Sequence, residues 1–184
     1  MIIVNEINMH KTQVSEKLNF AVYICSTSRY RQIEKGESFS DVSGDTIQTL
    51  VQAAGHTILY KEILLDDKTI INNALENCLT INNLDVIIFS GGTGISPTDV
   101  TIETITPFLE KTLPGFGEFF RRLSYDENKT ESLLTRATAG TKNGKAFFCI
   151  PGSPNAAKLA IEKLILPEAP HIIKHAREQH DTSR

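Results

Sequence analysis

A short run of β-branched and aromatic residues, 86–89, constrains the fold of this chain more than any other feature. The run stops abruptly at a polar, glycine-rich segment, and such a run is typical of a strand that is covered on both faces in a parallel sheet. Parallel strands need long crossover connections, which are usually helices. The run therefore predicts a mostly parallel sheet with helices on both faces.

The segments before this run alternate between strand and helix patterns. The expected order is strand 20–25, helix 43–54, strand 57–64, a helix from Asp66 or Asp67, and strand 86–89. Ser43 is the expected cap of the first helix and Gly55 its stop, whereas the polar segment before it, 26–41, is expected to be a mobile loop. Such alternation predicts right-handed crossovers and hence an α/β, doubly wound sheet.

The second half of the chain adds helices and one hairpin. A helix over 101–111 should restart at Pro107, with Thr106 as its new cap. Asn143-Gly144 between two strand patterns is a strong signal for a type I′ hairpin, which would add an antiparallel edge. The remaining predictions are a helix with Phe116, Phe119, Phe120 and Leu123 in the core, strand 146–150, a helix around 159–164 and a last helix from Pro167.

Length and composition favour one domain that binds small molecules. The 184 residues suit a single domain over 18–176, with an N-terminal extension, 1–17, and a polar C-terminal tail, 177–184. The 19 basic and 22 acidic residues give no electrostatic reason to expect nucleic acid or a membrane surface as a partner. Three widely spaced cysteines, without a signal-like or membrane-spanning segment, predict a reducing, cytoplasmic location.

The glycine-rich segment after residue 89 predicts an anion site. Gly91, Gly92 and Gly94 permit a close backbone approach, so successive amides can converge on a phosphate, and the Thr93 hydroxyl adds a donor. Asp99 follows where the next helix should begin. A carboxylate beside a phosphate is repulsive without a cation, so Asp99 is interpreted as a Mg²⁺ ligand. The alternative is a helix cap.

Loops after three predicted strands carry matching chemistry, at 26–29, 90–99 and 151–155. In doubly wound sheets, ligands bind beyond the carboxyl ends of the strands, so these loops are expected to form one crevice. Gly152 and Ser153 precede a helix, where free amides and the helix dipole favour an anion. The glycine segment matches neither the Walker pattern nor the dinucleotide fingerprint, because Pro97 stands where the latter needs a third glycine.

Several sequence blocks follow one another in a distinctive order along residues 18–170. They are Ser26-Thr27-Ser28-Arg29, Asp41-Val42-Ser43-Gly44, Ser90-Gly91-Gly92-Thr93-Gly94 with Asp99-Val100-Thr101, Pro114-Gly115-Phe116-Gly117-Glu118 with Arg121, and Pro151-Gly152-Ser153-Pro154. Each block alone is a weak signal, whereas the combination is specific. In these blocks the chain resembles the MoaB/Mog family of molybdopterin adenylyltransferases, and it is most similar to the MoaB branch.

The resemblance implies Mg²⁺-dependent transfer of AMP from ATP to the terminal phosphate of molybdopterin, with release of pyrophosphate. Asp99 occupies the position of the family's essential acid and metal ligand, and Thr93 and Ser153 are the other implied catalytic residues. Several relatives place an arginine just before this acid, where this chain has Thr98, so a possible phosphate contact is lost. The implied substrate-binding residues are Ser26, Ser28, Ser90, Gly91, Gly92, Gly94, Gly152, Asp41, Ser43, Gly44, Glu118 and Arg121.

The resemblance also implies a homotrimer or homohexamer, with the molybdate-inserting enzyme as a downstream partner. Glu118 and Arg121 are equally well explained as a surface pair about one helical turn apart. Two other functions stay open. One is a non-catalytic molybdopterin-binding or scaffolding module, and the other is a pyrophosphatase that acts on an ADP-ribose-like substrate, although Thr93 argues against it.

Overall fold

The computed structural model describes residues 17–178, apart from the side chains of residues 127 and 128. Within this part of the chain, a six-stranded sheet has the order β2-β1-β3-β6-β5-β4. Its first four strands are parallel, and β5 runs antiparallel to both β6 and β4. The strands are β1 (Asn19–Cys25), β2 (Thr57–Leu64), β3 (Val86–Ser90), β4 (Lys111–Thr112), β5 (Thr138–Lys142) and β6 (Lys145–Ile150). The predicted doubly wound, mostly parallel sheet is confirmed.

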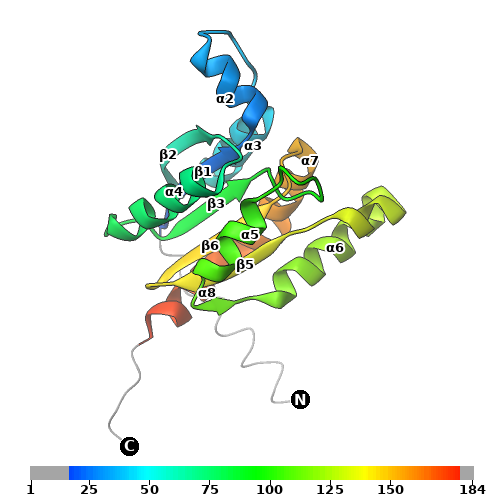
Figure 1. Cartoon of the computed structure of the whole chain (residues 1–184). Coiled ribbons are helices and arrows are strands. Elements are labelled where there is room, and N and C mark those ends of the chain that lie inside the picture. Colours follow the sequence, from blue (N-terminus) through cyan, green and yellow to red (C-terminus); the bar gives the residue numbers. More distant parts are fainter. Residues whose placement is uncertain (1–16, 179–184) are drawn as a thin grey trace, which may run out of the picture.

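Helices cover both faces of this sheet (Figure 1). One face packs against α4 and α5, and the other against α3, α6, α7 and α8. The helices are α2 (Thr27–Glu34), α3 (Val42–Ala53), α4 (Lys68–Thr80), α5 (Thr101–Ile105), α6 (Pro114–Asn128), α7 (Pro154–Ala160) and α8 (Leu166–Arg177), with 3₁₀ turns η2 (Thr106–Phe108) and η3 (Lys129–Leu134) and a π-helical turn η4 (Ile161–Ile165).

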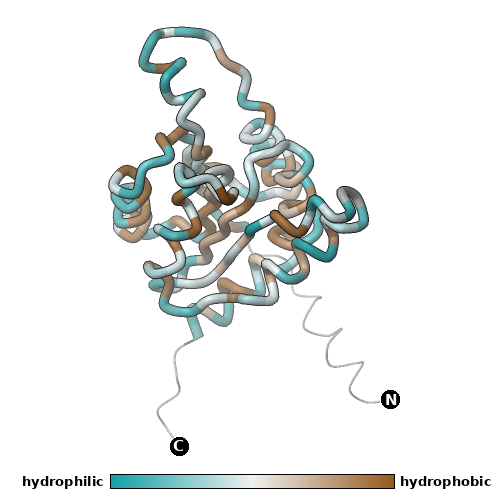
Figure 2. The backbone as a smooth tube through the Cα atoms, turned by 45° about the vertical axis from the view of Figure 1, so that its right-hand side comes forward, coloured by the Kyte–Doolittle hydropathy of each residue, from teal (hydrophilic) through white to brown (hydrophobic). Residues whose placement is uncertain are grey.

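The alternation of side chains along the central strands produces two cores. In β3, Val86 and Ile88 face one set of helices, whereas Ile87 and Phe89 face the other, and all four are fully buried. Figure 2 shows the apolar segments gathered in the centre and the hydrophilic segments around them. β3 is buried along its whole length, and the glycine turn follows directly after its last residue, Ser90.

The segment 26–41 is not the predicted loop, because its first half forms α2. Ser26 caps this helix, with its Oγ accepting from the amide of Arg29 at 3.4 Å. None of the residues of α2 is buried, and the helix extends away from the sheet in Figure 1. A helix that packs against nothing needs no apolar stripe, so the sequence pattern that predicts a packed helix is missing here. The cap of α3 is Asp41 rather than Ser43, since the Asp41 carboxylate accepts from the amide of Gly44 at 3.1 Å.

The predicted helix 101–111 is also wrong in its extent. α5 ends at Ile105 and the 3₁₀ turn that follows contains Pro107, whose ring nitrogen cannot donate a helical hydrogen bond. The chain then forms the short edge strand β4, in which Lys111 pairs with Thr141. Phe119, predicted to be core, is 57% exposed, whereas the neighbouring Phe120 is fully buried.

The predicted hairpin is confirmed between β5 and β6. Both of its turn residues have a positive φ, 48° at Asn143 and 70° at Gly144, as a type I′ turn requires. Arg177, predicted to open the polar tail, is instead the last residue of α8, and its guanidinium contacts Asp85 at 2.6 Å. Residues 1–16 and 179–184 of the predicted extension and tail lie outside the described residues. None of the described helices is both long and apolar enough to cross a membrane.

Candidate functional site

The turn after β3 lies against the ends of two neighbouring strands. Gly91 has a φ of 106° and Gly92 a φ of 61°, values that L side chains rarely adopt. The amide of Gly91 donates to Ile150 at the end of β6 at 3.0 Å, and a Cβ on Gly91 would overlap the carbonyl oxygen of Cys25 at the end of β1. Gly152, after β6, approaches Gly91 closely enough that its own Cβ would lie 3.1 Å from the Gly91 Cα. Two of the three predicted loops therefore meet here.

The amides of this turn are free to bind an anion. Among the residues that the structure describes, the amides of Gly92, Thr93 and Gly94 donate no hydrogen bond. The carbonyl groups of the same residues are all engaged. The amide of Thr101 donates to the Gly92 oxygen at 3.0 Å, and Arg136 donates to the oxygens of Thr93 at 2.9 Å and Gly94 at 2.6 Å. Consecutive unpaired amides in a turn form a concave site that binds phosphate.

Two carboxylates lie against this turn. A Cβ on Gly94 would lie 2.6 Å from Asp99 Oδ2, and a Cβ on Gly92 would lie 2.6 Å from Asp66 Oδ1. Asp99 accepts from the amide of Ser96 at 2.8 Å, and Asp66 Oδ2 accepts from the amide of Thr27 at 2.7 Å and its hydroxyl at 2.9 Å. Asp66 Oδ1 is buried without a hydrogen-bond partner in the described part of the chain. Such a carboxylate oxygen is costly unless a cation approaches it.

A cavity of about 350 Å³ opens in front of the turn. Its wall combines the glycine turn, the loop after β6 and the segment between η3 and β5. The lining residues are Gly91, Gly92, Thr93, Gly94, Asp99, Glu131, Leu134, Thr135, Arg136, Pro151 and Gly152. The space therefore has free amides, a carboxylate and a guanidinium on its wall, which are the groups that a metal-bound polyphosphate needs.

Sequence reasoning missed Asp66 and Arg136. The sequence predicts Asp66 only as a possible helix start, yet Asp67 caps α4, with its carboxylate accepting from the amides of Thr69 and Ile70. The sequence does contain a signal for Asp66: two consecutive acids follow a predicted strand, and the helix cap needs only one of them. Arg136 had no such signal, because it lies in an irregular segment far from the turn in sequence.

Cys25 also lies beside the turn but is unsuited to nucleophilic chemistry. Burial raises the pKa of its thiol to about 12, and the nearby Asp66 carboxylate acts in the same direction, although the neighbouring Thr101 hydroxyl partly opposes them. The thiolate is the nucleophilic form of cysteine, so this side chain stays protonated and unreactive at neutral pH. The Cys25 thiol is therefore not a candidate nucleophile of this site.

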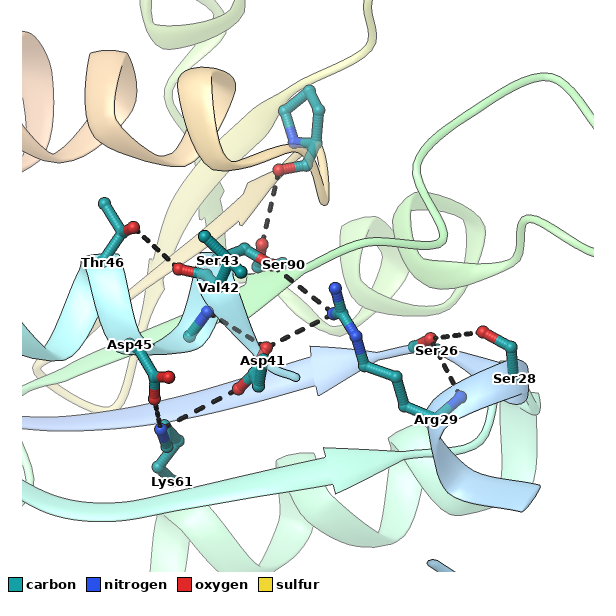
Figure 3. A network of polar contacts seen from close by, with 12 residues as sticks. Ser26, Ser28, Arg29, Asp41, Val42, Ser43, Asp45, Thr46, Lys61 and Ser90 are labelled. Carbon is teal, nitrogen blue, oxygen red and sulfur yellow. Dashed lines mark hydrogen bonds and ion pairs between the residues drawn. The ribbon is translucent and has the colours of Figure 1, made fainter. Parts of the chain in front are cut away.

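A second polar cluster surrounds the start of α3 (Figure 3). Asp41 is only 8% exposed and contacts Arg29 Nη1 at 3.3 Å and Lys61 Nζ at 3.9 Å, and Lys61 also pairs with Asp45. The same Arg29 nitrogen lies 3.4 Å from Ser43 Oγ. A separate cavity of about 600 Å³ lies beside this cluster, lined by Tyr30, Ile33, Phe39, Asp41, Asp45, Lys61, Glu62 and Ile63.

The other predicted site residues are placed as follows. Ser28 Oγ lies 3.3 Å from the capping Ser26 Oγ, and Ser90 Oγ donates to the carbonyl oxygen of Pro151 at 3.3 Å. Ser153 caps α7 by accepting from the amide of Ala156 at 3.2 Å. Glu118 and Arg121 are exposed on α6 and line neither of these two cavities.

The sequence and the fold are similar to those of known proteins. Residues 21–171 match the family model described as a probable molybdopterin binding domain. Molybdenum cofactor biosynthesis protein B of Staphylococcus epidermidis is 45% identical over 174 residues, which cover 90% of this chain and 95% of that protein. A probable molybdopterin adenylyltransferase of Methanocaldococcus jannaschii is 38% identical over 170 residues, covering 92% and 99%.

The fold is also similar to that of solved structures of related proteins. The tungsten cofactor synthesizing protein MoaB from Pyrococcus furiosus superposes with a TM-score of 0.77 at 38% identity, covering 90% of this chain and 100% of that one. A crystal structure of a molybdenum cofactor biosynthesis protein B gives a TM-score of 0.80 at 36% identity, covering 91% and 100%. The chain therefore belongs to the MoaB/Mog family of molybdenum cofactor biosynthesis proteins.

Proposed function

We propose that this protein is a molybdopterin adenylyltransferase, which transfers AMP from ATP to molybdopterin. An oxygen of the terminal phosphate of molybdopterin forms a bond to the α-phosphorus of ATP. The bond between that phosphorus and the oxygen bridging to the β-phosphorus breaks, and pyrophosphate leaves with its electron pair. Such a transfer depends on positioning and on neutralising charge rather than on a covalent enzyme intermediate.

One observation carries this proposal. The unpaired amides of Gly92, Thr93 and Gly94 line a cavity at the carboxyl end of β3, and two carboxylates lie against the same turn. Amides alone would suit any anion, and carboxylates alone would repel one. The combination of free amides with Asp99 in the cavity, and with Asp66 behind Gly92, suits a polyphosphate that arrives with a divalent cation. The name of one relative, a probable molybdopterin adenylyltransferase, supports molybdopterin and ATP as the two substrates.

Asp99 would hold the Mg²⁺ ion, and Asp66, which lies against Gly92 outside the cavity lining, would add negative charge behind the turn. The fit rests on Asp99 at the cavity wall, since magnesium prefers carboxylate oxygens together with phosphate oxygens and water. When bound, the ion would neutralise charge on the phosphate groups. Thr93 would add its hydroxyl to the phosphate site, and Gly152 would contribute backbone from the opposite side.

Ser26, Ser28, Asp41, Ser43 and Gly44 are proposed to support bound substrate from the second cluster. Ser153 would act through its position at the start of α7, where its side chain already serves as a cap. We also infer a homo-oligomer. In the described residues, Phe119, Leu133 and Leu134 are 57%, 84% and 59% exposed, and apolar side chains of this size are often covered by a partner subunit.

The experiment that tests the function is adenylylation of molybdopterin by the purified protein, with and without Mg²⁺. Asp99→Asn keeps an oxygen that can accept from the Ser96 amide but removes the charge, so we expect activity to be abolished while thermal stability is retained. Asp126→Asn, an exposed position on α6, is the matched control and should behave as the wild type. Wild-type turnover by Asp99→Asn would remove Asp99 from the mechanism. Cleavage of ADP-ribose without adenylylation would support the pyrophosphatase alternative instead.

A further inference from the structure

The glycine turn, residues 91–94, is held by hydrogen bonds to other elements of the fold. Glycine loses more backbone freedom on folding than any other residue, and residues 91–94 contain three glycines. Apart from the contacts of Gly91 with β6 and of Gly92 with Thr101, the hydrogen bonds that fix this turn come from one side chain, that of Arg136. Arg136 lies between η3 and β5, more than forty residues away in sequence.

The contacts of Arg136 set the direction of part of the backbone of the turn. Its Nε donates to the oxygen of Thr93 at 2.9 Å and its Nη2 to the oxygen of Gly94 at 2.6 Å. In a trans peptide the carbonyl and the following N–H point in opposite directions. Holding the two oxygens therefore fixes the directions of the amides of Gly94 and Ile95, and the Thr101 contact fixes that of Thr93 in the same way.

Arg136 is itself held from the other side by Glu103 on α5. Its Nη1 pairs with Glu103 Oε1, and its Nη2 lies 3.3 Å from Glu103 Oε2. The hydrogen bond from Arg136 lowers the pKa of Glu103, so this carboxyl stays ionised at neutral pH. A planar guanidinium can serve two carbonyls and a carboxylate at once because its donors form a fixed fork, which a lysine ammonium lacks.

We infer that Arg136, oriented by Glu103, is a positioning residue that sets the glycine turn in the shape that binds the polyphosphate. This inference rests on the proposed function. Arg136 acts through the turn, since most of its donors are engaged by the protein, and not chiefly as a free charge toward the substrate.

The test compares Arg136→Lys, Arg136→Gln and Glu103→Gln with Arg122→Lys, an exposed arginine on α6, as the matched control. Calorimetry measures the affinity for a non-hydrolysable ATP analogue with Mg²⁺, and NMR follows the amide resonances of the turn without ligand. We expect both Arg136 variants to weaken binding by about tenfold or more, the equivalent of one charge-assisted hydrogen bond. They should also broaden the turn resonances, with a smaller effect for Glu103→Gln and none for Arg122→Lys.

A lysine that restores wild-type affinity would show that charge alone matters and would overturn the inference. Unchanged turn resonances in both Arg136 variants would overturn it as well, because the turn would then hold itself. If the wild-type protein bound no ATP analogue while the Arg136 variants still disordered the turn, the proposed function would fail and the positioning role would stand.

Discussion

Replacing Gly92 with alanine tests whether the turn is shaped by close packing as well as by backbone conformation. The residue has a φ of 61°, and a left-handed conformation costs an L residue about 1–2 kcal/mol. A Cβ would also lie 2.6 Å from Asp66 Oδ1 and would overlap Thr101 Oγ1, and overpacking of this kind costs about 1–3 kcal/mol. The expected loss in the free energy of unfolding is therefore about 2–5 kcal/mol.

Gly55→Ala provides the matched control. Gly55 follows α3 with a φ of 86°, and a Cβ there would have no neighbour within 4 Å, so it carries the backbone cost without the contact cost. Any effect of alanine on the unfolded chain is shared by both variants. In urea, the free energy of unfolding of Gly92→Ala should be about 1–3 kcal/mol lower than that of Gly55→Ala. Equal losses would mean that the carboxylate of Asp66 and the hydroxyl of Thr101 do not press against the turn.

Two further predictions concern buried titratable groups. Burial lowers the pKa of His56 below its ordinary 6.5, and its Nδ1 must be neutral to accept from the amide of Leu18 at 3.2 Å. The unfolded chain therefore binds the proton more readily, so stability should fall as the pH drops below about 6.5, and less so in His56→Gln, as thermal melts at several pH values would measure. An equal pH dependence in both proteins would contradict this role. Lys145, 5% exposed, donates to the oxygens of Ile81 at 2.6 Å and Leu84 at 2.8 Å. Lys145→Met should cost about 1–3 kcal/mol in urea unfolding, because the Leu84 carbonyl loses its donor and the Ile81 carbonyl keeps only the amide of Leu84 at 3.3 Å. A variant as stable as the wild type would refute this reasoning.

The sequence determined those features of the protein that depend on local residue type. The strand at 86–89 is visible because a strand buried on both faces must be continuously apolar, and the hairpin at Asn143-Gly144 because few residues tolerate a positive φ. The same holds for the glycine turn after β3, since glycines after a buried strand leave the backbone exposed. Where a local signal was missing, as along the unburied α2, the prediction failed.

The tertiary structure decided which side chains surround that turn. Asp66 lies against Gly92 because the carboxyl ends of parallel strands align at one edge of the sheet, and not because of any pattern around Asp66 itself. Arg136 reaches the oxygens of Thr93 and Gly94 across 43 and 42 residues of sequence, through the way the chain enters β5. Backbone conformation depends on neighbouring residues, whereas hydrogen bonds between distant elements depend on packing. The sequence therefore predicted the glycine turn, and only the tertiary structure showed which residues hold it in place.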